Sequence, residues 1–117
     1  MRAKSASRTV SRNEKWFGPA IHPGEILLEE YFKPLGISQV DAAATLDVSL
    51  NRLNEIILGK RGITADTALR LARYFGTSAE LWTGLQADYD LRVARYAKAQ
   101  QIEREIEPLA ELEPACA

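Results

Sequence analysis

Apolar residues recur at intervals of three and four between residues 21 and 99, which is the spacing of side chains along one face of an α-helix. No stretch in this region alternates apolar and polar residues as a half-buried strand would. The hairpin signals Asn-Gly and Asp-Gly do not occur either. The pattern therefore predicts an all-α fold of five helices.

The first two predicted helices are delimited by residues that favour helix ends. Pro23 is suited to a first helical position, and Gly36 closes the segment just after Pro34. In this segment, apolar residues recur at helical spacing at Leu27 or Leu28, Tyr31 and Leu35. Ser38 is a suitable N-cap for the second helix, which is expected to end near Leu46.

The third and fourth helices follow after short connections. Ser49 is the expected N-cap of a helix over residues 50–58, with an inward stripe of Leu53, Ile56 and Ile57. Thr64 is the expected N-cap of the fourth helix, and Gly76 supplies its C-terminal stop. The apolar spacing in the fourth helix involves Ala65, Ala68, Leu69, Ala72 and Phe75.

The fifth helix is expected to begin after Ser78 and to be unusually long. Its apolar residues are spaced by 3, 4, 4 and 3 positions, at Trp82, Leu85, Tyr89, Val93 and Tyr96. This stripe extends past the point where a five-helix core is covered, and Pro108 limits how far the helix can run. The surplus residues Leu85, Tyr89, Val93 and Tyr96 are therefore predicted to form a self-complementary homodimer interface. Packing onto the first four helices of the same chain is the alternative, which applies to Trp82 and Leu85 more than to residues beyond Tyr89.

Charge divides the 117 residues into three parts, although the whole chain carries a net charge of only −1. Residues 1–20 have five basic residues and one acidic residue, whereas residues 100–117 have five acidic residues and one basic residue. We expect a flexible basic arm over 1–20, one domain over 21–99 and an acidic tail over 100–117. The arm is suited to contact phosphate, but a solvated terminus is an equally good interpretation.

Composition argues against several functional classes. No apolar run is long enough to span a membrane, and no apolar segment follows the basic N-terminus as in a secretory signal. One histidine, His22, and one cysteine, Cys116, cannot form a disulfide or a zinc site, so no metal or other cofactor is expected. We expect His22 to be a cap or surface residue, and the protein to be a cytoplasmic non-enzyme.

The second and third helices, Ser38–Leu46 and Ser49–Leu58, have the outline of a helix-turn-helix. In such a unit the second helix presents its N-terminal residues to base edges in the major groove. The candidate base-reading residues are Ser49, Leu50, Asn51, Arg52, Asn54 and Glu55. The candidate phosphate-binding residues are Ser38, Gln39, Lys60 and Arg61. Spacing alone leaves open a helical pair with no role in DNA binding.

The string SQVDAAATLDVSLNRLNEIILGKR resembles the helix-turn-helix of the phage-repressor-like family. Flanking strings, HPGEILLEEY before it and ITADTALRLARYFGTSAELWTGLQADYDL after it, resemble HigA-type antitoxins of bacterial toxin–antitoxin modules. Two positions depart from the wider family. Asp47 replaces a glycine in the turn, where we expect a left-handed backbone, and Ala42 replaces a leucine in the first helix.

The resemblance implies a dimeric antitoxin that binds double-stranded operator DNA, represses its own operon and neutralises a RelE-like ribonuclease toxin. One alternative is a stand-alone transcription regulator with the same DNA site and no toxin partner. Another is an interaction module that has lost its DNA-binding face. The presence of a small basic gene product encoded next to this chain would favour the first of the three.

Overall fold

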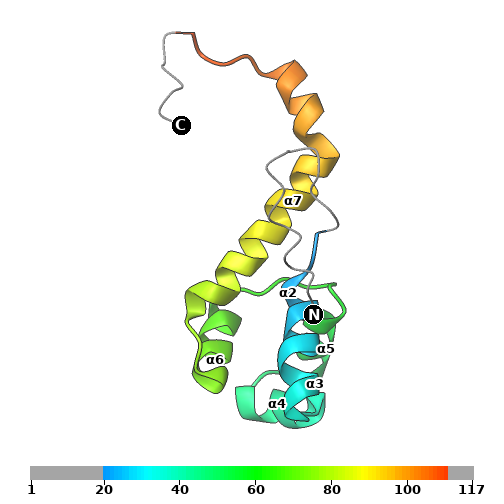
Figure 1. The fold of residues 1–117 in the computed structure, drawn as a ribbon, viewed down its shortest axis with the longest axis vertical. Coiled ribbons are helices and arrows are strands. Elements are labelled where there is room, and N and C mark those ends of the chain that lie inside the picture. The colour runs from blue at the N-terminus through cyan, green and yellow to red at the C-terminus, as the bar shows by residue number, and fades with distance from the viewer. Residues whose placement is uncertain (1–19, 111–117) are drawn as a thin grey trace.

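The computed structural model describes residues 20–110, and all regular structure in that range is helical (Figure 1). The elements are α2 (Pro23–Ile26), η2 (Leu27–Phe32), α3 (Lys33–Leu35), α4 (Gln39–Leu46), α5 (Leu50–Ile57), α6 (Ala65–Phe75) and α7 (Ala79–Glu105). Because α2, η2 and α3 follow one another without a break, the described chain forms five helical segments, which confirms the predicted fold class. Most of the basic arm (1–19) and residues 111–117 of the acidic tail, with Cys116, lie outside the described residues.

The first helical segment contains a wide turn directly before a proline. η2 is a π-helix, and the Lys33 N–H donates to the Leu28 carbonyl five residues back. In a regular α-helix the Pro34 ring would clash with the carbonyl four residues before it, so a widened turn relieves that contact. The segment ends at Gly36, whose φ of 67° is left-handed. Leu35 in this last turn is 60% exposed and lies outside the core, although it shares the helical spacing of the segment.

Side-chain caps begin the other helices as predicted. The hydroxyls of Ser38, Ser49, Thr64 and Ser78 each accept a hydrogen bond from the backbone N–H three residues later. Each bond satisfies one of the N–H groups that a helix start leaves without an intrahelical partner. These caps fix where α4, α5, α6 and α7 begin.

The core lies where the first segment meets α4, α5, α6 and the beginning of α7. It comprises Leu27, Phe32, Ala42, Ala43, Leu46, Leu53, Ile56, Ile57, Ile63, Ala68, Leu71 and Trp82. In α6, Ala68 and Leu71 are fully buried, whereas Leu69 is 64% exposed. Leu69 lies about 100° around the helix from Ala68, which places it outside the buried stripe. Leu69 thus shares the apolar spacing of this helix but does not belong to the core.

α2 and α5 approach each other closely at Gly24. A Cβ atom at this position would lie only 1.8 Å from the carbonyl oxygen of Ile56. The contact involves backbone, which cannot rotate aside as a side chain can, so only glycine fits here. The absence of a side chain at Gly24 thus sets how the first segment crosses the C-terminal end of α5.

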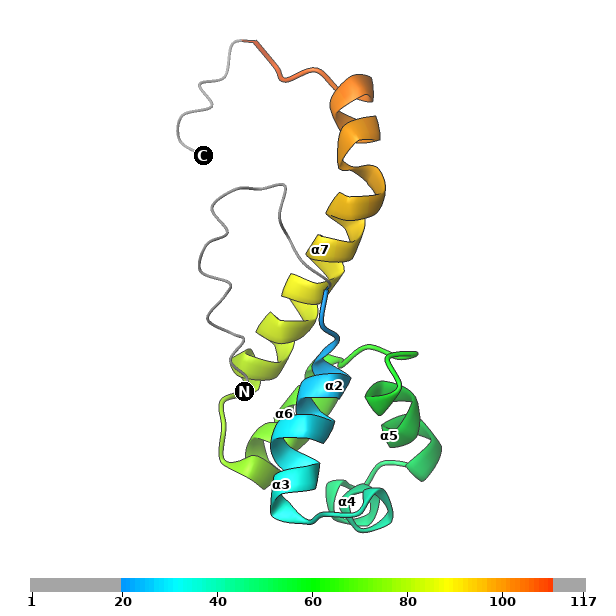
Figure 2. The ribbon, with the colours of Figure 1, turned by 45° about the vertical axis from the view of Figure 1, so that its right-hand side comes forward.

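α7 begins in the core and then extends away from the other helices (Figures 1 and 2). Trp82 is fully buried, Leu85 packs against the core, and the Tyr89 ring lies 4.9 Å from the His22 ring. Farther along, Val93 is 44% and Tyr96 is 89% exposed. The predicted stripe therefore divides into an inner part that covers its own core and an outer part that does not.

The C-terminal end of α7 agrees with the limit expected from Pro108. The helix ends at Glu105, and Ile106 has an extended backbone. α7 crosses the predicted boundary between residues 99 and 100, so the first residues of the acidic tail are helical. No helix within residues 20–110 is both long enough and apolar enough to cross a membrane.

Candidate nucleic-acid interface

α4 and α5 are joined by a turn of three residues, 47–49, and pack against each other as the two helices of a helix-turn-helix. Asp47 has a left-handed backbone with φ of 60°, as predicted for the residue that replaces glycine. Its N–H donates to the Ala44 carbonyl, and the N–H of Val48 donates to the Ala43 carbonyl. Ala42 is fully buried. These contacts fix the angle between α4 and α5.

The start of α5 exposes both polar and apolar side chains to solvent. Ser49, Leu50 and Asn51 are all exposed, and Leu50 is 47% exposed. The Asn51 amide and the Ser49 hydroxyl are suited to base edges, and the apolar Leu50 side chain is suited to a thymine methyl. Asn54, one turn later, is half-buried and donates from Nδ2 to the Gln39 Oε1 of α4 at 3.3 Å. This bond leaves the Gln39 Nε2 and the Asn54 Oδ1 for other partners.

Glu55 and Arg61 form an ion pair with each other. The Arg61 Nη2 lies 2.7 Å from the Glu55 Oε1, and the Arg61 Nε donates to the same oxygen at 2.9 Å. The backbone N–H groups of Lys60 and Arg61 also donate to the Glu55 carbonyl. The chain after α5 thus folds back onto that helix, and it leaves the Lys60 side chain exposed. The candidate base-reading residue Glu55 and the candidate phosphate-binding residue Arg61 therefore contact each other in this structure.

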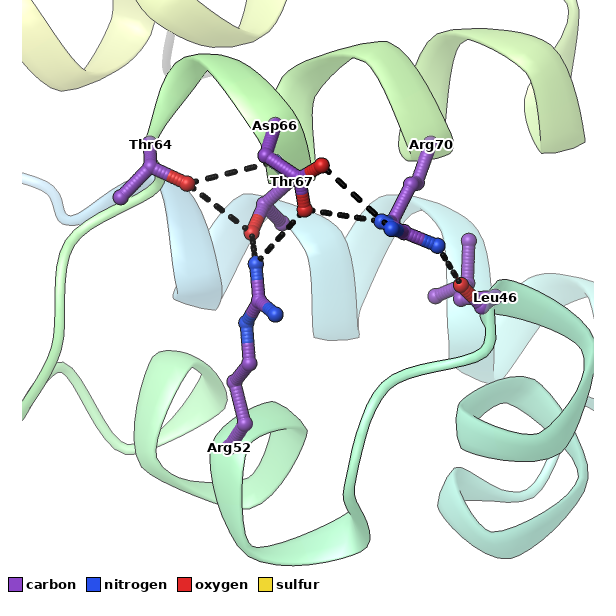
Figure 3. Close-up of polar contacts among 6 residues, drawn as sticks. All are labelled: Leu46, Arg52, Thr64, Asp66, Thr67 and Arg70. Carbon is purple, nitrogen blue, oxygen red and sulfur yellow. Dashed lines mark hydrogen bonds and ion pairs between the residues drawn. The ribbon is translucent and has the colours of Figure 1, made fainter.

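The Arg52 side chain does not project outward, which differs from the expectation for a base-reading residue. The side chain is 26% exposed and reaches from α5 to the first turn of α6 (Figure 3). The Arg52 Nη2 donates to the Asp66 Oδ2 at 3.1 Å and to the Thr67 Oγ1. Arg52 lies at the side of α5 that faces α6, so its length and charge are used within the protein.

Asp66 binds a second arginine on its own helix. The Arg70 Nε donates to the Asp66 Oδ2 at 2.8 Å, while the Arg70 Nη1 donates to the Leu46 carbonyl at 3.0 Å (Figure 3). That carbonyl belongs to the last turn of α4, where helix geometry leaves it without an intrahelical donor. Hydrogen bonds from Arg70 and Arg52 hold the pKa of Asp66 below its usual value, and Asp66 in turn raises the pKa of Arg70. We name Arg52, Asp66, Thr67 and Arg70 the α6 cluster.

His22 acts as the N-cap of α2, which is one of the two predicted roles, and it is buried and not a surface residue. Its Nδ1 accepts from the Gly24 N–H at 2.9 Å, which requires an unprotonated nitrogen. Burial lowers the pKa of His22, although the nearby Asp90 carboxylate opposes this effect. Within residues 20–110, no group of three or more His, Cys, Asp or Glu side chains is arranged to hold a metal ion.

Arg52 is the one member of the α6 cluster that was singled out from the sequence, as a candidate base-reading residue, whereas Asp66, Thr67 and Arg70 were not. The four-residue separation of Asp66 and Arg70 is a signal for a pair on one helix face, because such residues are neighbours on the helix surface. No comparable signal exists for Arg52, which is separated from Asp66 by fourteen positions and a loop. That contact depends on where the fold places α6 relative to α5.

Known proteins share both the sequence and the fold. Residues 28–82 match the helix-turn-helix family. The chain is 59% identical over 80 residues to virulence-associated protein I of Dichelobacter nodosus, a match that covers 68% of this chain and 74% of that protein. The chain is also similar to a solved structure, Pseudomonas aeruginosa antitoxin HigA with the higBA promoter, at 50% sequence identity and a TM-score of 0.75. The match covers 77% of this chain and 98% of the HigA chain.

The antitoxin GraA in complex with its operator is 38% identical to this chain. The match covers 80% of this chain and 94% of GraA, with a TM-score of 0.76. The predicted resemblance is thus confirmed, and these two structural matches cover 77% and 80% of this chain. The chain belongs to the HigA antitoxin family of helix-turn-helix proteins.

Proposed function

We propose that this chain is an antitoxin that binds operator DNA, represses its own operon and neutralises a RelE-like ribonuclease toxin by direct contact. The observation that carries the DNA-binding part is the exposed first turn of α5, with Ser49, Leu50 and Asn51. Solved relatives include HigA with the higBA promoter and GraA with its operator. A regulator without a toxin partner is the alternative.

α5 enters the major groove with its N-terminal turn foremost. In this arrangement Asn51 pairs with an adenine edge and Leu50 contacts a thymine methyl. The exposed Lys60 contacts phosphate after the end of α5, and Arg61 does so if its pair with Glu55 opens. Ser38 and Gln39, at the start of α4, contact the phosphates on the other side of the groove.

Operator binding by this domain requires two copies, since one helix-turn-helix contacts too few base pairs to be selective. Dimers of this kind read half-sites about 34 Å apart. We assign the dimer contact to the outer part of the α7 stripe, Val93 and Tyr96, whose side chains are exposed in the part of the chain that the structure describes. Leu85 and Tyr89 contribute less than the sequence predicted, because they face the core and His22.

The first helical segment supplies acidic surface for a basic toxin. Glu25, Glu29 and Glu30 are exposed there, and Glu29 pairs with Lys33 at 2.9 Å. A ribonuclease binds RNA and therefore carries a basic surface, so these carboxylates steer it toward the antitoxin and speed association. The acidic residues of the C-terminal tail add to this effect.

Changing Asn51 to alanine is expected to weaken binding to the operator by about 1–3 kcal/mol and to leave binding to scrambled DNA nearly unchanged. The exposed amide is lost, while the caps and packing of α5 remain. Titration of a labelled duplex from the region upstream of the gene measures the change. Gln100→Ala, which removes an exposed amide from α7, is the matched control and retains full affinity. Equal affinity of the two variants for the operator would contradict the assignment of α5 as the reading helix.

Co-expression of this chain with the small basic product of the neighbouring gene is expected to rescue cells from the toxicity of that product. The two proteins should also co-purify. Rescue should persist in Asn51→Ala, because neutralisation by direct contact does not depend on operator binding. If the neighbouring product is harmless, or if Asn51→Ala abolishes rescue while the protein remains folded, the stand-alone regulator replaces the antitoxin.

A further inference from the structure

The α6 cluster connects both helices of the helix-turn-helix to one carboxylate. Asp66 is in the first turn of α6, after the N-cap Thr64, and it receives Arg52 from α5 and Arg70 from its own helix. Arg70 also reaches the end of α4 through the Leu46 carbonyl. Figure 3 shows the two guanidinium groups on either side of Asp66.

Arg52 occupies a position from which an arginine would ordinarily read DNA. It directly follows the exposed Asn51 in the first turn of α5. Its guanidinium fork matches the two acceptors of a guanine edge and the oxygens of a phosphate, and it stands on a flexible stem. In this structure the fork is instead directed toward α6, where the buried Thr67 supplies an acceptor beside Asp66. The carboxylate attracts the cation that DNA would otherwise attract.

We propose that Asp66 is a specificity-determining residue that holds Arg52 away from DNA and thereby limits base reading to the neighbouring residues of α5. This inference rests on the proposed function, because it concerns how the domain selects its operator. Without Asp66, Arg52 turns toward the groove and adds a contact that any phosphate can provide. Such a contact strengthens binding to all sequences and so lowers selectivity.

The test compares Asp66→Ala with the wild-type protein, using the duplex from upstream of the gene and a scrambled duplex of the same composition. Asp66→Ala is expected to bind scrambled DNA more tightly, with a salt slope steeper by about one unit. Between about 50 and 200 mM salt, it should lose about 3-fold more affinity for scrambled DNA than the wild-type protein loses. The ratio of operator affinity to scrambled affinity should decrease.

The double variant Asp66→Ala, Arg52→Ala separates release of Arg52 from general damage to the fold. Removal of the released arginine should return the salt slope and the affinity ratio to their wild-type values. Arg70→Ala is the matched control, because it removes the contact to the Leu46 carbonyl but leaves Asp66 to hold Arg52. Its salt slope should equal that of the wild-type protein.

Asp66→Asn provides the same comparison if the alanine variant does not fold. It removes the charge that attracts Arg52 but keeps the size of the side chain. The double variant Asp66→Asn, Arg52→Ala should likewise return the salt slope and the affinity ratio to their wild-type values. An unchanged salt slope in the folded single variant, or no recovery in the double variant, would overturn the role of Asp66. A wild-type protein that does not distinguish the two duplexes would instead refute the proposed function.

Discussion

Replacing Trp82 by alanine is expected to lower the free energy of unfolding by about 3–5 kcal/mol, which is a large part of the stability of a domain of this size. Trp82 is fully buried at the start of α7, and its ring lies 5.2 Å from that of Tyr31. The indole Nε1 donates to the Thr77 Oγ1 at 2.8 Å. Alanine would leave a cavity between α7 and the first helical segment, and urea denaturation measures the loss.

Two further variants show whether packing accounts for this loss. Trp82→Phe keeps an aromatic ring but removes the bond to Thr77, so it should cost less than the alanine variant. Tyr96→Ala removes an aromatic ring that is 89% exposed on the same helix and should change the unfolding free energy of the monomer little. A similar loss for Trp82→Ala and Tyr96→Ala in the monomer would contradict the burial assigned to Trp82.

The double variant Val93→Asp, Tyr96→Asp is expected to be a folded monomer that binds the operator at least about 100-fold more weakly. When two reading helices are joined in a dimer, binding of one half-site favours binding of the other and raises the overall affinity by factors of this size. A monomer binds one half-site at a time and loses this gain. Both side chains are exposed in the described chain, so charge at these positions opposes a self-complementary contact without disturbing the core. Sedimentation measures the oligomeric state, and duplex titration measures the affinity.

The matched control is Ala87→Asp, Ala94→Asp, which adds the same charge at exposed positions of α7. These residues lie at least about 100° around the helix from Val93 and Tyr96. The control should remain a dimer and bind the operator as the wild-type protein does. If the Val93, Tyr96 variant also remains a dimer, the interface lies elsewhere on the molecule.

The features that the sequence predicts well are local ones. An N-cap depends on one side chain and a backbone N–H three residues later, so Ser38 and Ser49 could be placed without knowledge of the fold. The left-handed turn at Asp47 also depends on a few adjacent residues. Helical spacing is less decisive, because it identifies an apolar face but not its width. Leu35 and Leu69 lie at the margins of such faces and are exposed.

Contacts between helices were beyond the reach of the pattern. From the sequence alone, Arg52 is expected to be an outward-facing cation on α5. Asp66 is its partner only because of where the fold places α6. The pairing of Glu55 with Arg61 likewise depends on the path of the chain after α5. A charged side chain near a helix end has several partners within reach, and tertiary packing selects among them.

The close approach at Gly24 has a consequence for the length of DNA that a dimer can recognise. α2, the first turn of the first helical segment, lies between the end of α5 and the middle of α7. Gly24 contacts Ile56 of α5, and the His22 ring contacts the Tyr89 ring of α7. Since no flexible linker separates the three parts, a rotation of α7 would carry α5 with it. A dimer joined through α7 therefore holds its two reading helices at one separation, and it tolerates little variation in the number of base pairs between half-sites.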